Sequence, residues 1–261
     1  MRLSLAISLT LVIAAPAAAQ QRPFIFSVVT APDSKPAVRV DYDLGLGERA
    51  FQSGSSNQPE QRVGVQASRG RLTLLARVGI VETGSSYQSS QSGEALYSVL
   101  RPERGPALAV GGGVLHEADG VNVLLARVAT GHTGERWRLQ GNLLFQKPMS
   151  EERDAVDLIT SVGWTRKVGR SVSFGVEVLG EDLEGFWESE EAEGGARLLA
   201  GPSLHIAPAD GRWQVVATGG PMFHPADSGR ASGALRDLPP DPHRVSYAIK
   251  ASFSIGLTSM R

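Results

Sequence analysis

Hydrolytic chemistry is the first activity to consider, because a serine activated by a histidine can cleave esters and the chain holds 5 His. No G-x-S-x-G pattern surrounds a serine, and no H-E-x-x-H spacing offers a metal site. With 0 Cys there is no thiolate ligand. The sequence therefore predicts no enzyme, no cofactor and no metal centre, with lipid hydrolysis by a Ser/His pair as an alternative. The histidines are His116, His132, His205, His224 and His243.

The acidic segment from Gly180 to Gly194 (GEDLEGFWESEEAEG) is the most unusual local feature, because it contains seven carboxylates. Hard divalent cations prefer oxygen ligands, so the 180–194 loop could bind such cations. The spacing lacks the Asp/Asn-rich pattern of a calcium loop, and a run of charges is usually a solvated surface. Both interpretations stay open.

Charged residues recur at alternate positions in segments whose other positions are apolar, as in the stretch that contains Val38, Val40 and Tyr42. Side chains of a strand point to opposite faces in turn, so the charges share one face. Both signs are present, so this face either forms a plug of salt bridges or lines a water-filled pore and biases which solutes pass. The residues expected to face the interior of a barrel are Arg39, Asp41, Asp43, Arg77, Arg127, Arg138, Asp157, Glu177, Glu181, Arg197, His205 and Lys250.

About twelve alternating segments follow one another along the chain, and most have the roughly ten residues that a tilted strand needs to cross a membrane. No segment after the first 19 residues has the apolar length of a membrane-spanning helix. An even number of strands lets the first and last pair, so we predict an all-β, antiparallel up-and-down barrel. The strands are expected near 38–46, 61–68, 71–81, 94–101, 107–116, 121–130, 136–145, 155–166, 171–181, 196–206, 213–223 and 246–257.

The connections alternate in length, which is a second signal. Short turns rich in Gly, Pro or Asp are expected at 68–71, 102–106, 131–135, 167–170 and 207–211. Long loops are expected at 48–60, 82–93, 146–154, 182–195 and 224–245, with a brief one at 117–120. Short periplasmic turns and long extracellular loops are typical of a membrane barrel. A soluble periplasmic β-barrel or sandwich that binds a ligand would share the alternation of faces but not that of loops.

The N-terminal residues have the order of a secretory signal peptide. Met1 and Arg2 precede an apolar run at 3–15, and three alanines lie before Gln20. We expect export through the Sec pathway and cleavage after Ala19, which leaves 20–261 as a single domain. The formal net charge of -1 argues against a nucleic-acid partner.

Together these features resemble bacterial outer-membrane β-barrel proteins in general. The last strand also resembles the family's assembly signal in the spacing of Lys250, Ser252, Ile255 and Leu257, although Ser252 replaces a glycine and four residues follow the motif. The resemblance implies a porin-like protein of the outer membrane that contacts its lipid, its lipopolysaccharide and the assembly machinery. It would act as a passive small-solute channel or as a closed structural barrel.

Overall fold

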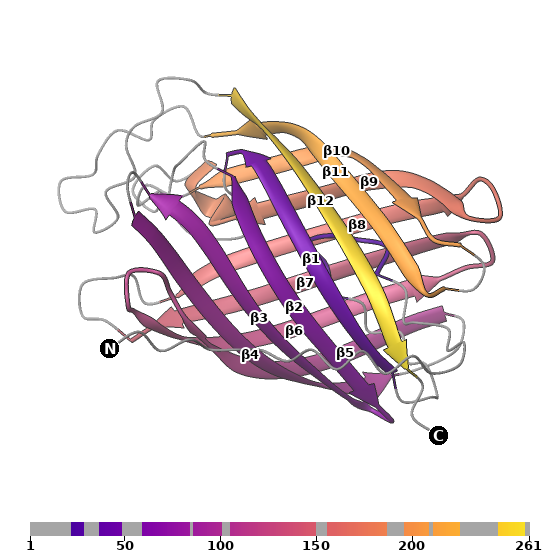
Figure 1. The fold of residues 1–261 in the computed structure, drawn as a ribbon, viewed down its shortest axis with the longest axis horizontal. Coiled ribbons are helices and arrows are strands. Elements are labelled where there is room, and N and C mark those ends of the chain that lie inside the picture. The colour runs from indigo at the N-terminus through magenta and orange to yellow at the C-terminus, as the bar shows by residue number, and fades with distance from the viewer. Residues whose placement is uncertain are drawn as a thin grey trace, which may run out of the picture.

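The computed structural model describes residues 22–28, 37–48, 59–83, 86–100, 105–149, 156–186, 196–208, 211–224 and 245–258. The expected signal peptide, residues 1–19, lies outside this range. Twelve strands form one closed barrel, in which each strand pairs with its neighbours in the chain and β1 pairs with β12 (Figure 1). The strands are β1 Ala37–Gly47, β2 Glu60–Arg69, β3 Leu72–Thr83, β4 Ser86–Leu100, β5 Gly105–His116, β6 Asn122–Thr133, β7 Trp137–Pro148, β8 Asp157–Lys167, β9 Val172–Glu181, β10 Arg197–Ile206, β11 Trp213–Phe223 and β12 Val245–Thr258.

The closure between β1 and β12 confirms the predicted antiparallel barrel of twelve strands. Tyr42 lies opposite Phe253 and Leu44 opposite Ala251, so the two ends of the chain complete the sheet. Among the described residues, helical structure is limited to the short 3-10 turn η1, Leu183–Phe186. No helix in this part of the chain is long and apolar enough to cross a membrane.

The prediction of a long loop at 82–93 is wrong. β3 continues to Thr83 and β4 begins at Ser86, so the two strands form a tall hairpin, with Ile80 opposite Ser89 and Val78 opposite Gln91. Residues 88–93 are polar or glycine on both faces and carry no apolar alternation. Backbone pairing with β3 makes this segment a strand in spite of its composition, because ladder hydrogen bonds do not depend on the side chains.

The outward face of the barrel is apolar. Tyr247 and Ile249 are 70% and 61% exposed, and exposed valines, leucines and isoleucines continue around the strands. Trp137, Trp164 and Trp213 are also exposed, each near the short-turn end of its strand. Such a surface is suited to lipid, where aromatic residues gather at the interfaces.

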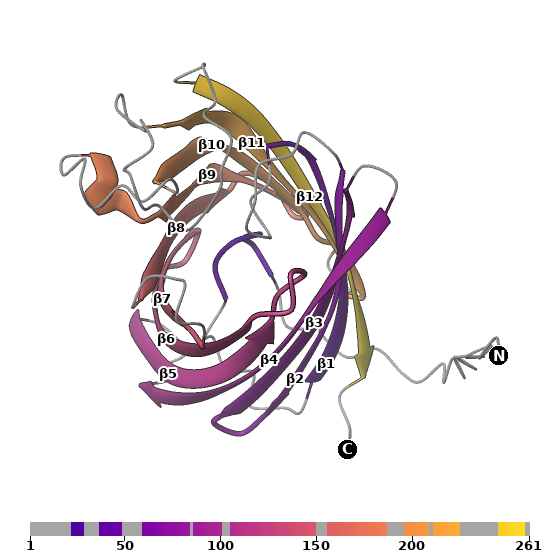
Figure 2. The ribbon, with the colours of Figure 1, turned by 90° about the vertical axis from the view of Figure 1, so that its left-hand side faces the viewer.

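The inward face is polar and charged, and the chain itself passes through the space that it encloses. Residues 22–28 lie inside the barrel, where Figure 2 shows them as an indigo arc surrounded by the strands. Phe24 is 0% exposed, and Arg22, Ile25, Ser27 and Val28 are also buried. This stretch is called the N-terminal segment below.

Candidate functional site

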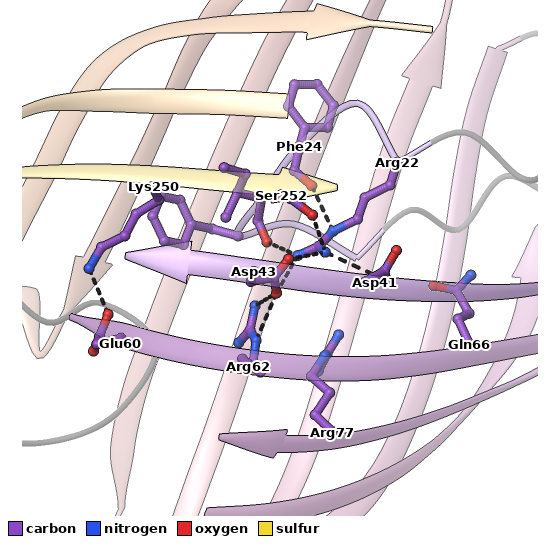
Figure 3. A network of polar contacts seen from close by, with 12 residues as sticks. Arg22, Phe24, Asp41, Asp43, Glu60, Arg62, Gln66, Arg77, Lys250 and Ser252 are labelled. Carbon is purple, nitrogen blue, oxygen red and sulfur yellow. Dashed lines mark hydrogen bonds and ion pairs between the residues drawn. The ribbon is translucent and has the colours of Figure 1, made fainter. Parts of the chain in front are cut away.

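Arg22 anchors the N-terminal segment to the wall formed by β1 and β12 (Figure 3). Its Nη1 donates to Asp43 Oδ1 at 2.6 Å and to Ser252 Oγ at 2.9 Å. The same guanidinium donates to the carbonyls of Phe24 and Ile25, at 3.2 and 2.7 Å, which folds the segment around it. Charge-assisted bonds of this kind are stronger than neutral ones, so Arg22 fixes one end of the segment.

Side chains of the opposite wall bind the backbone of the segment. The carboxylate of Glu177 on β9 accepts the N–H groups of Ile25 and Phe26, at 3.1 and 2.7 Å. Asn142 on β7 accepts from the N–H of Val28 at 3.1 Å and donates to its carbonyl at 3.3 Å. A buried backbone group needs such a partner, and here the wall supplies it in place of water.

Apolar contacts complete the fit of the segment. Phe24 lies against Gly163, where an added Cβ would lie 2.3 Å from its Cδ1, so a larger residue would displace the ring. Phe26 packs on a buried cluster of Leu179, Leu199, Met222 and Ala248. Val28 forms another cluster with Leu75 and Leu96. The segment therefore contacts several strands around the barrel.

Ion pairs on the wall surround the segment. Arg62 Nη2 lies 2.7 Å from Asp43 Oδ2, so Asp43 pairs with Arg22 and Arg62 together. Arg39 Nε donates to Asp41 Oδ1 at 2.7 Å. Lys250 Nζ lies 2.6 Å from Glu60 Oε2, and both side chains are almost fully buried. The opposite partner of each charge offsets the cost of removing that charge from water.

Arg77 on β3 and Arg127 on β6 share one carboxylate, that of Glu94 on β4. Arg77 Nη1 lies 3.0 Å from Glu94 Oε1, and Arg127 Nε lies 2.6 Å from Oε2. A cavity of about 140 Å³ remains next to the segment and is lined by Arg39, Arg62, Arg77 and Arg127, among others. This is well below the roughly 300–1,000 Å³ of a small-molecule site.

All twelve residues expected to face inward lie on the inner face of the strands. Arg77, Arg138 and Arg197 are half-buried, and the other nine are buried. Arg197 Nε donates to Glu181 Oε2 at 2.7 Å. His205 Nε2 lies 3.2 Å from Gln214 Oε1. Most of these charged side chains therefore form ion pairs inside the barrel.

Sequence reasoning did not list Arg22, Glu60, Arg62 or Glu94. Arg62 and Glu94 lie on the inward face of strands already predicted at 61–68 and 94–101, and Glu60 precedes the first of these by one residue, so the same alternation would have found all three. Arg22 precedes the first strand and shows no periodic signal, so only the folded structure could place it.

The histidines do not assemble a hydrolytic centre in the described part of the chain. His224 Nε2 lies 3.4 Å from Ser246 Oγ, but the same nitrogen lies 3.0 Å from Glu48 Oε2, and the serine hydroxyl donates to that carboxylate. A catalytic relay uses the two ring nitrogens for its two partners. Burial acts to raise the pKa of Glu48, but the hydrogen bonds from His224 and Ser246 outweigh it and lower the pKa below its usual range. The cluster joins β1, β11 and β12 at the barrel rim.

The acidic loop is described only to residue 186, so cation binding there is not tested. Within the described part, Glu181 pairs with Arg197, and Asp182 Oδ1 accepts from the N–H of Leu158 at 3.0 Å. No three His, Cys, Asp or Glu side chains gather around a potential metal position among the described residues.

The chain thus belongs to the class of closed antiparallel barrels with twelve strands, a polar interior and an apolar exterior. Neither a protein-family model nor a curated protein sequence matches it. Its fold is similar to that of the KdgM porin, with a TM-score of 0.55 and 7% identity over 83% of this chain and 98% of that one. The NanC porin is similar too, with a TM-score of 0.56 and 10% identity over the same shares. The KdgM porin is also known in complex with disordered oligogalacturonate.

Proposed function

We propose that the protein is an outer-membrane channel for small hydrophilic solutes, closed in this state by its own N-terminal segment. The N-terminal segment lies in the space that the strands enclose (Figure 2). Residues 22–28 lie in the lumen, where Asp43, Asn142 and Glu177 bind them, so the chain's own N-terminal segment fills part of the enclosed space. Side chains just fill a barrel of about eight strands, and diameter grows with strand number, so a barrel of twelve strands encloses more space than its wall side chains fill.

The outer surface supports membrane insertion over a soluble periplasmic binder. Exposed apolar side chains such as Val63, Leu74, Leu139 and Ile255 come from strands all around the barrel. A soluble protein rarely exposes an apolar patch of more than a few hundred Å², because such a surface associates in water. Together with the predicted signal peptide and the porin fold, this surface favours the outer membrane.

The solute class follows from the residues beside the segment. Four arginines, Arg39, Arg62, Arg77 and Arg127, line the remaining cavity. Among the described residues that line the cavity, Glu94 is the only carboxylate, and Asp41 and Asp43 pair with Arg39 and Arg62 from the wall. Guanidinium groups bind carboxylates and phosphates in bidentate geometry, so we extend the proposal to small anionic solutes. The oligogalacturonate bound by the KdgM porin supports this extension by analogy.

Conductance in planar bilayers tests the proposal. The protein lacking its signal peptide is compared with a variant in which residues 22–28 are replaced by a Gly/Ser stretch of equal length. We expect brief, rare openings for the first and steady conductance for the second, with a reversal potential that favours anions. Absence of conductance in both would leave a closed structural barrel, and release into an osmotic-shock supernatant would contradict the location.

A further inference from the structure

A second, smaller pocket lies on the inner wall at the short-turn end of the barrel, distinct from the cavity lined by the four arginines. Its volume is about 160 Å³, which corresponds to about ten water positions at roughly 10–15 Å³ each. A drug-sized ligand needs roughly 300–1,000 Å³, so only a small ligand fits. This space is called the mouth pocket below, and its wall includes Thr133, Arg138, Thr165, Lys167, Ser173 and His205.

Strand pairing brings polar side chains to one level of the mouth pocket. Arg138 on β7 lies opposite Thr165 on β8. Ser173 on β9 lies opposite both Lys167 on β8 and His205 on β10. Alternate positions of a strand share a face, and these positions are on the face that points into the barrel. Polar side chains from four neighbouring strands therefore converge on one small space.

Positive charge exceeds negative charge in the mouth pocket. Arg136, Arg138 and Lys167 line it, and Glu135 is the only carboxylate among its described lining residues. Within the described ranges of the chain, the ammonium group of Lys167 has no carboxylate partner. An anion that enters the pocket would therefore meet a lysine whose charge the described wall does not compensate, and such charge-assisted contacts are strong.

Hydroxyl groups accompany these cations. Thr165 is 4% exposed, and its hydroxyl forms no hydrogen bond with another described residue. A buried polar group without a protein partner usually binds water or a ligand. Ser173 supplies a second hydroxyl from the neighbouring strand. A lysine as a point charge, an arginine fork and two hydroxyl donors suit an anion with several oxygen atoms.

The N-terminal segment forms one side of the mouth pocket, because Pro23 lines it. The N–H of the preceding residue, Arg22, donates to Gln214 Oε1 at 2.8 Å, and His205 Nε2 lies 3.2 Å from the same oxygen. His205 thus contacts the pocket and also the side chain that binds the start of the segment. The pocket is complete only while the segment lies in the lumen.

We propose that the mouth pocket binds a small oxyanion of the phosphate type and that this ligand holds the N-terminal segment in the closed position. The inference rests on the proposed function, because it concerns regulation of the same channel. A ligand that binds the closed state better than the open state shifts the equilibrium toward closure. At about ten times its dissociation constant, with no binding to the open state, it raises the ratio of closed to open barrels about elevenfold.

Phosphorus NMR of inorganic phosphate tests binding without any measurement of conductance. The phosphate signal is followed at constant ionic strength as detergent-solubilised protein is added, which gives the dissociation constant. Lys167→Gln should weaken binding about tenfold or more, since it removes a charged donor. Arg170→Gln removes an exposed cation from the turn between β8 and β9, outside the pocket, and should leave binding unchanged.

The variant with a Gly/Ser stretch at 22–28 tests the contribution of the segment. It lacks Pro23, so it should also bind phosphate more weakly than the wild type. Equal binding by the wild type and Lys167→Gln would overturn the site. Equal binding by the wild type and the Gly/Ser variant would overturn its dependence on the closed state.

Planar bilayers test the effect of phosphate on closure. Phosphate replaces chloride on one side of the membrane at a time, at constant ionic strength and at about ten times the dissociation constant. We expect the opening frequency of the wild type to fall about tenfold from one side only, and to stay constant in Lys167→Gln. An equal effect from both sides, or in Lys167→Gln, would contradict control through the pocket. A Gly/Ser variant that never conducts would refute the channel itself, while the phosphate titrations would still report on the pocket.

Discussion

Replacing Arg22 with alanine should release the N-terminal segment while leaving the wall intact. The side chain donates to Asp43, Ser252 and two carbonyls of its own segment. Asp43 keeps Arg62 at 2.7 Å, so the variant does not leave an unpaired buried carboxylate. The loss is therefore that of a charged hydrogen-bond group, about 2–3 kcal/mol, and not the larger penalty of a broken isolated pair. At 1.36 kcal/mol for each factor of ten, the ratio of open to closed barrels rises about 30- to 150-fold.

Single-channel recording measures this ratio directly as the fraction of time spent open. Arg22→Lys keeps the charge but loses the fork that contacts several acceptors, so it should give an intermediate open fraction. Arg166→Ala removes an arginine from the outer face of β8 and serves as the matched control. If Arg22→Ala folds and its open fraction equals that of the wild type, Arg22 does not hold the barrel closed.

Two further variants test the fit of the segment and the stability of the wall. Gly163→Val should expel Phe24, whose Cδ1 lies 2.3 Å from the position of an added Cβ, and should accelerate amide exchange of Ile25; unchanged protection would contradict this packing. Lys250→Met breaks a buried pair with Glu60 and should lower the free energy of unfolding by about 3–5 kcal/mol in guanidinium titrations. Adding Glu60→Met should recover most of the lost free energy of unfolding. A double variant that is less stable than Lys250→Met alone would refute the pairing.

Most strands could be predicted because the two faces of the wall require different residues, which alternate along the sequence. Lipid selects apolar residues outside and the lumen selects polar residues inside, so stretches such as β12 alternate from Tyr247 to Leu257. The start of β4 was not predictable in this way. Its Ser-rich and Gln-rich faces are alike, and only pairing with β3 makes it a strand.

The closed state of the lumen could not be predicted from the sequence. Alternation indicates which charges face inward, but not whether water or protein lies between them. The segment at 22–28 has no period, and its partners, such as Asn142 and Ser252, lie far from it in the chain. Its position depends on contacts that exist only after the barrel has closed.

A reversible lock on the segment tests the central claim most directly. Ser27 Oγ and Ser161 Oγ lie 2.9 Å apart, and the chain has 0 Cys, so the pair Ser27→Cys and Ser161→Cys can form a single disulfide. Conductance is recorded from one membrane before and after addition of a reductant. We expect a silent oxidised protein in which openings appear on reduction. Openings of equal frequency in the two states, or silence in both, would contradict closure of the channel by its N-terminal segment.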